Sequence, residues 1–233
     1  MCTCSLVLAT DTQDYAKQRS ALIDGITNDV RATAFYLGRE RLDPRVLEAL
    51  GQVPRHEFVP WLERQRAYRN QPLPIGHGQT ISQPYIVAIM TDLLDPEPGH
   101  RVLEVGTGSG YQAAVLAELV KQVYSIEIIE PLARAAGKRL QALGYDSVTT
   151  RIGDGYYGWP EHAPFDGIVV TAAASHVPPP LLAQLKPGGR MVIPVGSPFL
   201  TQQLVLIKKN KDGALITRQL LPVRFVPLTG EQN

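Results

Sequence analysis

The sequence predicts a doubly wound α/β fold, with a mostly parallel sheet of seven strands, an antiparallel hairpin at one edge and an N-terminal helical appendage. Two observations predict it. Short apolar runs alternate with stretches of helical periodicity between residues 102 and 195, and such alternation is typical of a parallel sheet. Two further apolar runs, 204–208 and 215–223, are joined around Asp212 and Gly213, as expected of an antiparallel hairpin.

Length and composition indicate one globular unit with an appendage. The chain has 233 residues, of which 44% are hydrophobic and 19% are charged. We place the appendage at residues 1–75 and the ligand-binding unit at residues 76–233. The 23 Lys and Arg against 22 Asp and Glu form no long basic cluster, which argues against nucleic acid as a partner. No run of about 18 apolar residues is present, so we expect no membrane span.

The appendage is predicted from helical periodicity between residues 15 and 69. Asp43 is the expected N-cap of its second helix, with Pro44 in the first turn, and Gly51 and Pro54 close that helix. Two apolar stripes mark the buried faces, formed by Ala21, Leu22, Ile26, Val30 and Ala34 and by Val46, Leu47 and Leu50.

The two cysteines, Cys2 and Cys4, are expected in a frayed terminus. They are poorly spaced for a disulfide with each other and too few to hold a metal. The first residues lack the basic start of a secretory signal, so the cytoplasm is the expected compartment.

The remaining elements follow in chain order. Residues 72–84 are rich in glycine and proline, and the helix after them has Ile86, Ile89, Met90 and Leu93 on one face and ends at 96–99. The later predictions are a strand at 102–105, a helix at 111–119, strands at 122–128, 147–152 and 166–171, a helix around 181–185, a turn at 186–189 and a strand at 191–195.

A glycine loop follows the first predicted strand and indicates a ligand site. Gly106, Gly108 and Gly110 come directly after the apolar run, where open α/β sheets bind ligands. A dinucleotide fingerprint spaces its glycines G-x-G-x-x-G, whereas Tyr111 stands here at the third position. A phosphate loop is excluded because no Lys-Ser/Thr pair follows. The alternative is a tight strand–helix turn without a ligand.

Three acids decide which ligand the loop suits. Glu104 lies just before the glycines, where its charge would repel a phosphate and attract a cation such as the sulfonium or ammonium of S-adenosylmethionine. Glu127, about 20 residues beyond the loop, is placed to bind ribose hydroxyls. Asp154 could accept from an adenine amino group, with Gly155 leaving room for the ring. Each acid alone could be a helix cap, but together they predict a methyl-donor site.

Methyl transfer from a sulfonium depends mainly on positioning the acceptor. A carboxylate acceptor, with a pKa of about 4, needs no base. After the fourth strand, residues 171–175 (Thr-Ala-Ala-Ala-Ser) offer no titratable group, which favours such an acceptor. In segment 79–84, Ser82 could donate to the carboxylate while Thr80 and Ile81 line the donor pocket; the alternative is that Ser82 caps the next helix. His77 could be a base, but we favour a structural or solvent-facing role.

The sequence resembles the protein-L-isoaspartate O-methyltransferases over roughly residues 42–229. The resemblance rests on 78–84 (Gly-Gln-Thr-Ile-Ser-Gln-Pro), 103–111 (Leu-Glu-Val-Gly-Thr-Gly-Ser-Gly-Tyr), 153–155 (Gly-Asp-Gly), 185–190 (Leu-Lys-Pro-Gly-Gly-Arg) and 223–228 (Val-Arg-Phe-Val-Pro-Leu). The glycine loop is shared by many methyltransferases, whereas the Thr-Ile-Ser-x-Pro segment is specific to this family.

The resemblance implies a Rossmann-like methyltransferase fold and S-adenosylmethionine as donor. The acceptor would be the α-carboxylate of an L-isoaspartyl, or D-aspartyl, residue in a damaged protein, whose methyl ester collapses to a succinimide. Ser82 would be the active-site serine, and the donor contacts would include Thr80, Ile81, Gly106, Glu127, Asp154 and Gly155, with Thr229 near the end. We expect a monomer without a metal, in which residues 1–37 can be trimmed.

Three other hypotheses remain open at this point. A relative could methylate a different carboxylate, and activity on isoaspartyl against aspartyl peptides separates that case. A binding module could sense S-adenosylmethionine without turnover, although the Ser82 segment argues against it. A nicotinamide enzyme is opposed by the glycine spacing.

Overall fold

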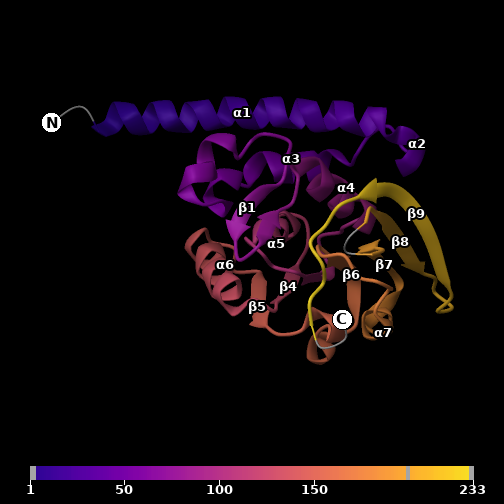
Figure 1. Cartoon of the computed structure of the whole chain (residues 1–233). Helices are drawn as coiled ribbons and strands as arrows, with labels where there is room; N and C mark the ends of the chain where they lie inside the picture. The colour runs from indigo at the N-terminus through magenta and orange to yellow at the C-terminus, as the bar shows by residue number, and fades with distance from the viewer. Residues whose placement is uncertain (1–3, 198–199, 231–233) are drawn as a thin grey trace.

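The computed structural model describes residues 4–197 and 200–230, with only the helical backbone described for 4–14 (Figure 1). A seven-stranded sheet has the order β5-β4-β3-β6-β7-β8-β9, in which β5, β4, β3, β6 and β7 are parallel and β8 pairs antiparallel with both β7 and β9. The strands are β3 (Arg101–Val105), β4 (Gln122–Glu127), β5 (Val148–Ile152), β6 (Phe165–Val170), β7 (Leu185–Val195), β8 (Gln202–Lys209) and β9 (Leu215–Val223). The predicted parallel sheet with an antiparallel edge hairpin is confirmed.

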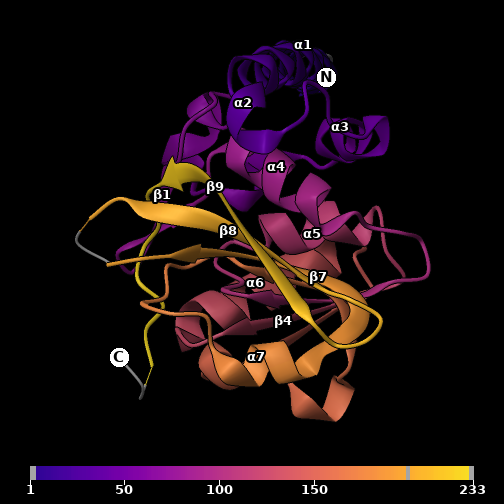
Figure 2. The same cartoon turned by 90° about the vertical axis from the view of Figure 1, so that its right-hand side faces the viewer.

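Helices cover both faces of the sheet (Figure 2). One face packs against α4 (Pro84–Leu94), α5 (Tyr111–Ala117) and α6 (Glu130–Ala142), and the other against α7 (Pro179–Gln184) and the short turns η3 (Gly155–Tyr157) and η4 (Pro160–His162). Neighbouring residues of one strand face opposite clusters: Val102 packs on the α4 side and Leu103 on the α7 side. Burial on both faces explains why the strands read as continuous apolar runs.

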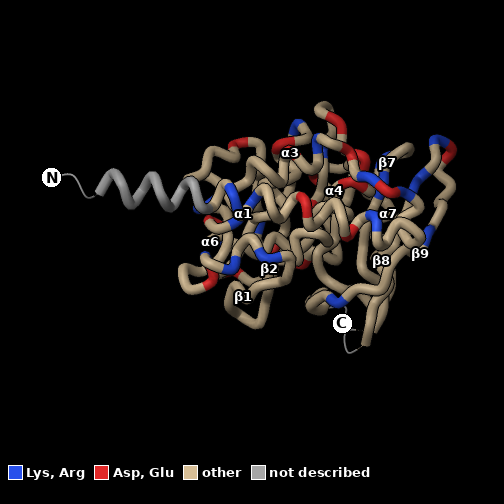
Figure 3. The backbone as a smooth tube through the Cα atoms, turned by 90° about the horizontal axis from the view of Figure 1, so that it is seen from above, with Lys and Arg blue, Asp and Glu red and all other residues tan. Residues whose placement is uncertain are grey.

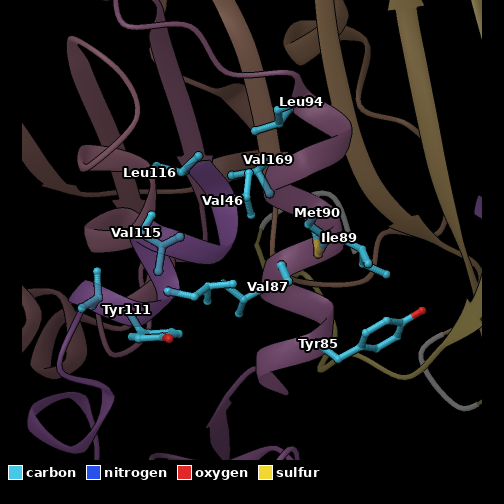
Figure 4. Packing of buried hydrophobic residues seen from close by; sticks show 14 of the residues in the cluster. Val46, Tyr85, Val87, Ile89, Met90, Leu94, Tyr111, Val115, Leu116 and Val169 are labelled. Atoms are coloured by element: carbon cyan, nitrogen blue, oxygen red, sulfur yellow. The ribbon is translucent and has the colours of Figure 1, made fainter. Parts of the chain in front are cut away.

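Helix α4 links the sheet to the appendage. Its Val87, Met90 and Leu94 lie among Val115 of α5 and Val169 of β6 (Figure 4). Its other side meets α1 (Cys4–Ala32) and α3 (Pro44–Gln52). The appendage also contains α2 (Ala34–Leu37) and the turns η1 (Arg55–Phe58) and η2 (Trp61–Arg66). Helices α1 to α4 and η1 contribute to one continuous apolar core. The predicted division at residue 75 falls within β1 (Leu73–Gly76), the first strand of the chain.

The start of the chain is more tightly packed than the sequence suggested. Leu22, Ile26 and Val30 of α1 are 5%, 0% and 1% exposed, and the Thr33 hydroxyl lies 2.5 Å from the Tyr85 hydroxyl of α4. The expectation that residues 1–37 can be trimmed is therefore revised, because these side chains fill the core. Cys4 begins α1 and so is helical in its backbone, whereas Cys2 lies outside the described residues.

The cap at α3 is confirmed, and a small hairpin is new. Asp43 accepts a hydrogen bond from the Arg45 backbone N–H, with Pro44 at the first helical position. In the glycine- and proline-rich segment, β1 (Leu73–Gly76) pairs antiparallel with β2 (Gln79–Ile81). His77 sits in their turn at φ 54° and is exposed. Strands of four and three residues are too short to show a periodicity.

The turn predicted at 186–189 is wrong as a boundary, because these residues lie inside β7. Leu185 pairs with Phe165 and Arg190 pairs with Gly167, so four residues of β7 stand opposite one residue of β6. Leu185 is 1% exposed and is held in the sheet by its burial, while the residues after it form a bulge. The other predicted helix and strand boundaries in the sheet domain differ from the structure by at most two residues.

The described part of the chain has mixed charges and no long apolar helix, as its composition predicts. Basic and acidic segments are interspersed along the backbone (Figure 3). Among residues 4–197 and 200–230, no helix combines the length and the apolar character that a membrane span requires. The same residues contain no group of three or more His, Cys, Asp or Glu placed to hold a metal.

Candidate functional site

Three cavities meet at the carboxyl ends of β3, β4 and β6. We name them by an ionisable residue that lines each one: the Glu127 cavity, the Glu104 cavity and the Arg224 cavity. Thr80 and Thr171 line all three. The site therefore has a common point between β2 and the end of β6, from which the three cavities diverge.

The Glu127 cavity lies over the ends of β3 and β4. It is lined by Gln79, Thr80, Val105, Gly106, Gly108, residues 126–129, Gly155, Thr171, Ala172 and residues 226–229. Glu127 is 6% exposed, and its carboxylate accepts hydrogen bonds from the backbone N–H of Gly108 (2.8 Å) and of Ile129 (2.9 Å). Glu127 thus fixes the glycine loop from the neighbouring strand.

Glu104 is a fully buried acid, and one of its two carboxylate oxygens has no hydrogen-bond partner. The Ser125 hydroxyl donates to its Oε2, and the Thr107 hydroxyl lies 2.6 Å from that of Ser125. Oε1 is buried without a hydrogen-bond partner. Burial raises the pKa of Glu104 to about 8, against the hydrogen bond from Ser125, which lowers it. A cation in the Glu104 cavity would satisfy Oε1 and favour the ionised form.

Two of the glycines lining these cavities are required by close backbone approaches. Gly106 has φ 96°, and a Cβ there would lie 2.5 Å from the Thr171 Oγ1. That hydroxyl donates to the Gly106 carbonyl at 2.7 Å. At Gly155 a Cβ would overlap Val105 Cγ1. Any side chain at these positions would push β3, β6 or Thr171 away from the site.

Gly110 and Asp154 do not line any of the three cavities. Gly110 faces α6, where a Cβ would lie 3.2 Å from Leu140 Cδ1, so it allows close helix packing. The Asp154 carboxylate accepts from the Tyr156 backbone N–H at 2.9 Å and so caps η3. The capping alternative thus applies to Asp154, and its contact with an adenine remains a prediction.

Segment 79–83 lies between two of the cavities. Ile81 and Ser82 line the Glu104 cavity, and Ser82 also lines the Arg224 cavity. The N-cap of α4 is Gln83, so the idea that Ser82 is the cap is wrong. Its hydroxyl is thus in place to meet a ligand at the junction of the two cavities.

The Arg224 cavity is wide and holds one basic side chain. It encloses about 960 Å³, against about 310 Å³ for the Glu104 cavity, both including space open to solvent. Its lining is Pro72, Thr80, Ser82, Gln83, Ile86, Thr171, Thr201 and residues 222–226. Arg224 is exposed and is the only Lys or Arg among these described lining residues. The cavity therefore suits an extended ligand that carries a negative charge.

Sequence reasoning missed Thr171 and the backbone pairing that positions the C-terminal segment, although it named Thr229 as a donor contact. The Ala173 backbone N–H donates to the Val226 carbonyl, and that of Leu228 donates to the Ala173 carbonyl, both at 2.8 Å. This ladder lays residues 226–228 beside the end of β6 and places Thr229 in the Glu127 cavity. The position of Thr171 at a strand end was visible in the sequence, but its contact with Gly106 was not.

Comparisons with known proteins agree on one family. A model of the family "Protein-L-isoaspartate(D-aspartate) O-methyltransferase (PCMT)" matches residues 34–233. The protein-L-isoaspartate O-methyltransferase 2 of Polaromonas sp. (strain JS666) is 66% identical over 211 residues, covering 91% of this chain and 100% of the relative. The protein-L-isoaspartate O-methyltransferase 1 of Cupriavidus necator is 63% identical over 228 residues, covering 98% and 87%.

A solved structure shares the fold. It is a Plasmodium falciparum protein described as a protein-L-isoaspartate O-methyltransferase, in complex with S-adenosyl-L-homocysteine. It matches with a TM-score of 0.74 and 25% identity over 91% of this chain and 98% of that one.

Proposed function

This chain belongs to the protein-L-isoaspartate(D-aspartate) O-methyltransferase family, and from that premise we propose how its own residues carry out the reaction. The enzyme transfers a methyl group from S-adenosylmethionine to the free α-carboxylate of L-isoaspartyl, and D-aspartyl, residues in damaged proteins and peptides. The ester then leads to a succinimide, through which normal aspartate is regained. The sheet with its three joined cavities is the framework for both ligands.

The Glu104 and Glu127 cavities fit the methyl donor. Glu104 Oε1, buried and without a partner, is suited to the ammonium group of the methionine part. The Glu127 carboxylate, held by two backbone N–H groups, has further lone pairs for ribose hydroxyls. Gly106 and Gly108 allow the donor to approach the backbone, and Ile81, Thr80 and Gly155 complete the walls. We assign Asp154 and Thr229 to the adenine end.

The Arg224 cavity fits the acceptor. An α-carboxylate is ionised at neutral pH, so the protein has to orient it without removing a proton. The Ser82 hydroxyl donates to one carboxylate oxygen and leaves the other free to attack, while Arg224 attracts the negative charge. When bound, the donor supplies a methyl group on a positively charged sulfur. Thr80 and Thr171, at the point where the cavities join, surround the path between acceptor and methyl group.

The observation that carries this proposal is the junction of the cavities. Ser82 lines both the cavity that contains Glu104, whose Oε1 has no hydrogen-bond partner, and the cavity that contains Arg224. The Glu104 cavity, which suits a cation, and the Arg224 cavity, which suits an anion, therefore lie on opposite sides of Ser82. That arrangement suits a reaction in which a cationic donor meets an anionic acceptor.

The test compares two peptides that differ only in an isoaspartyl or an aspartyl linkage. Labelled methyl from S-adenosylmethionine should appear as a base-labile ester on the isoaspartyl peptide alone. Equal labelling of both peptides would point to a different carboxylate acceptor. Tight donor binding without transfer to either peptide would point to a sensing module and would overturn the proposal.

We also propose that the protein acts in the cytoplasm as a monomer, with residues 1–75 as an appendage on the methyltransferase unit of residues 76–233. The scarcity of cysteines, two in 233 residues, supports a reducing compartment. Sedimentation at micromolar concentration tests the monomer, and a dimer mass would contradict it.

A further inference from the structure

Arg55 is a fully buried arginine of the appendage, in η1, behind the site. Among the described residues it has no ion pair with a carboxylate, and it donates hydrogen bonds to the backbone carbonyls of Ala67, Gln71 and Ser82. A buried charge is costly unless its surroundings compensate it, so this arginine calls for an explanation.

The hydrogen bonds of Arg55 lead to the acceptor serine. Its Nη2 donates to the Ser82 carbonyl at 2.8 Å, and its Nε donates to the Ala67 carbonyl at 2.9 Å. The first bond holds the backbone of the residue whose hydroxyl lines the junction of the cavities. The second ties the guanidinium to the appendage. Arg55 is thus a bridge from the N-terminal helices to Ser82.

The same guanidinium also lies over the ring of Tyr111, next to the glycine loop. Its central carbon is 4.8 Å from the centre of the Tyr111 ring, within the range of a cation–π contact. Tyr111 is the first residue of α5, directly after the glycine loop, and it lines the Glu104 cavity. Arg55 therefore contacts both Ser82, which we assign to the acceptor, and Tyr111, which directly follows the glycine loop.

We propose that Arg55 is a positioning residue for methyl transfer, which fixes Ser82 relative to the glycine loop and so sets the geometry between acceptor and donor. This inference rests on the proposed function, because it assigns the acceptor to Ser82. Misplacement of a reacting group by about 1 Å costs about 100-fold in rate. A fixed fork of donors is suited to this task, and a lysine, with a single flexible ammonium, is not.

The test is Arg55→Lys, with Arg101→Lys as the matched control. Arg101 also lies over an aromatic ring, Tyr124 at 5.5 Å, and donates to a carbonyl, that of His162 at 2.8 Å. It is the first residue of β3 and so lies at the amino end of that strand, opposite to the site at the carboxyl ends. We measure the Kd of S-adenosyl-L-homocysteine by calorimetry, and kcat and KM with the isoaspartyl peptide at saturating donor.

We expect Arg55→Lys to keep the Kd within about twofold and to lower kcat at least about tenfold, while Arg101→Lys changes neither by more than about twofold. Ser82→Ala should lower kcat strongly in the wild type but less than about threefold in the Arg55→Lys background, because the two residues act together. Where Arg55→Lys does not fold, Arg55→Gln, which removes the buried charge and keeps one donor, is measured by the same criteria.

An unchanged kcat would overturn the proposal. So would a loss of donor affinity as large as the loss of kcat, since that indicates a general distortion, and so would an equal effect of Ser82→Ala in both backgrounds. A wild-type protein that binds the donor without methylating the isoaspartyl peptide would instead overturn the proposed function, independently of Arg55.

Discussion

The donor side and the acceptor side of this site are built in different ways. The donor side is formed mainly by the ends of neighbouring parallel strands: β3 gives Glu104 and the glycine loop, and β4 gives Glu127. The acceptor side brings together β2, the end of β6 and the segment after β9, which lie far apart in the sequence. The first side follows from the topology of the sheet, whereas the second depends on how other segments fold over it.

This difference predicts which substitutions affect each side of the site. The donor loop is held by short-range contacts with its own sheet, such as Glu127 with Gly108 and Thr171 with Gly106. Ser82 is held from outside the sheet, by Arg55 of the appendage. Changes in the appendage should therefore affect the acceptor side, and changes in the sheet should affect the donor side.

The largest effect is expected from deleting residues 1–37. The deletion removes Leu22, Ile26, Val30 and Leu37 from the core, and each such side chain contributes about 1.5–3 kcal/mol to the free energy of unfolding. The sum is comparable to the total stability of an ordinary domain, about 5–15 kcal/mol. We expect a protein that does not fold, or that unfolds well below the wild-type temperature, as measured by circular dichroism.

The control is a deletion of residues 1–14, which leaves those four side chains in place. We expect it to unfold at the wild-type temperature and to keep its activity. A stable, active protein without residues 1–37 would show that neither the core nor the acceptor side needs this part of the appendage, and would contradict the prediction.

How much of the site was predictable follows from the same contrast. The strand, the glycine loop and Glu104 lie within ten residues, so strand periodicity and loop chemistry could locate the donor side. Gly110 and Asp154 were assigned to the donor site from their spacing; Gly110 packs against α6, and Asp154 caps η3, so that its adenine contact stays a prediction. Spacing gives the position of a residue along the chain, and it does not give the direction in which that residue faces.

On the acceptor side the residues alone left two interpretations of Ser82 open, and only the family resemblance favoured the acceptor-binding one. Ser82 looked like a helix cap, because a serine before Pro84 is the usual sign of one. Arg55 has no recognisable motif around it in the sequence, and its three carbonyl partners lie 12, 16 and 27 residues away. Thr171 belonged to a run without titratable groups, and its role depends on a Gly106 backbone 65 residues away.

The donor side can be tested at Gly106. In Gly106→Ala the new methyl group must displace Thr171, and the backbone at φ 96° is strained as well. We expect the affinity for S-adenosyl-L-homocysteine, measured by calorimetry, to fall by at least about 100-fold, or about 2.7 kcal/mol. Gly144→Ala is the control, because Gly144 has φ 80° and no atom within 4 Å of a new Cβ. Equal affinities for both variants would show that donor binding does not require the close backbone approach at Gly106.

The acceptor side can be tested at Ser82. Ser82→Ala removes a hydrogen bond to a charged carboxylate, which contributes about 1.5–3 kcal/mol, so kcat/KM for the isoaspartyl peptide should fall by about tenfold to 100-fold. The donor affinity should stay the same, because Glu104 and Glu127 are untouched. Ser175→Ala, at a residue outside the three cavities, should behave as wild type. A loss of donor affinity in Ser82→Ala would mean that the two sides are not separable.

The last expected effect is a pH dependence of donor binding through Glu104. Burial raises the pKa of Glu104 to about 8, so in the donor-free protein the carboxyl is protonated at pH 7. A donor ammonium beside Oε1 favours the ionised form, and binding therefore releases a proton. It follows that the donor affinity rises from pH 6 to pH 8, by about tenfold per unit at most.

The raised pKa of Glu104 also makes the stability of the donor-free protein depend on pH, in the direction opposite to the donor affinity. Because the folded state holds this proton more tightly than the unfolded state, whose pKa is near 4.5, stability falls as the pH rises from 4.5 to about 8. In Glu104→Gln, neither the donor affinity nor the stability should change with pH in this way. The ligand's own titration affects wild type and variant equally, so the difference between the two proteins reports on Glu104 alone. Calorimetry in two buffers of different ionisation enthalpy measures the released proton directly. Equal proton release in both proteins would show that the buried acid does not meet the donor, and the donor side would then rest on the glycine loop and Glu127 alone.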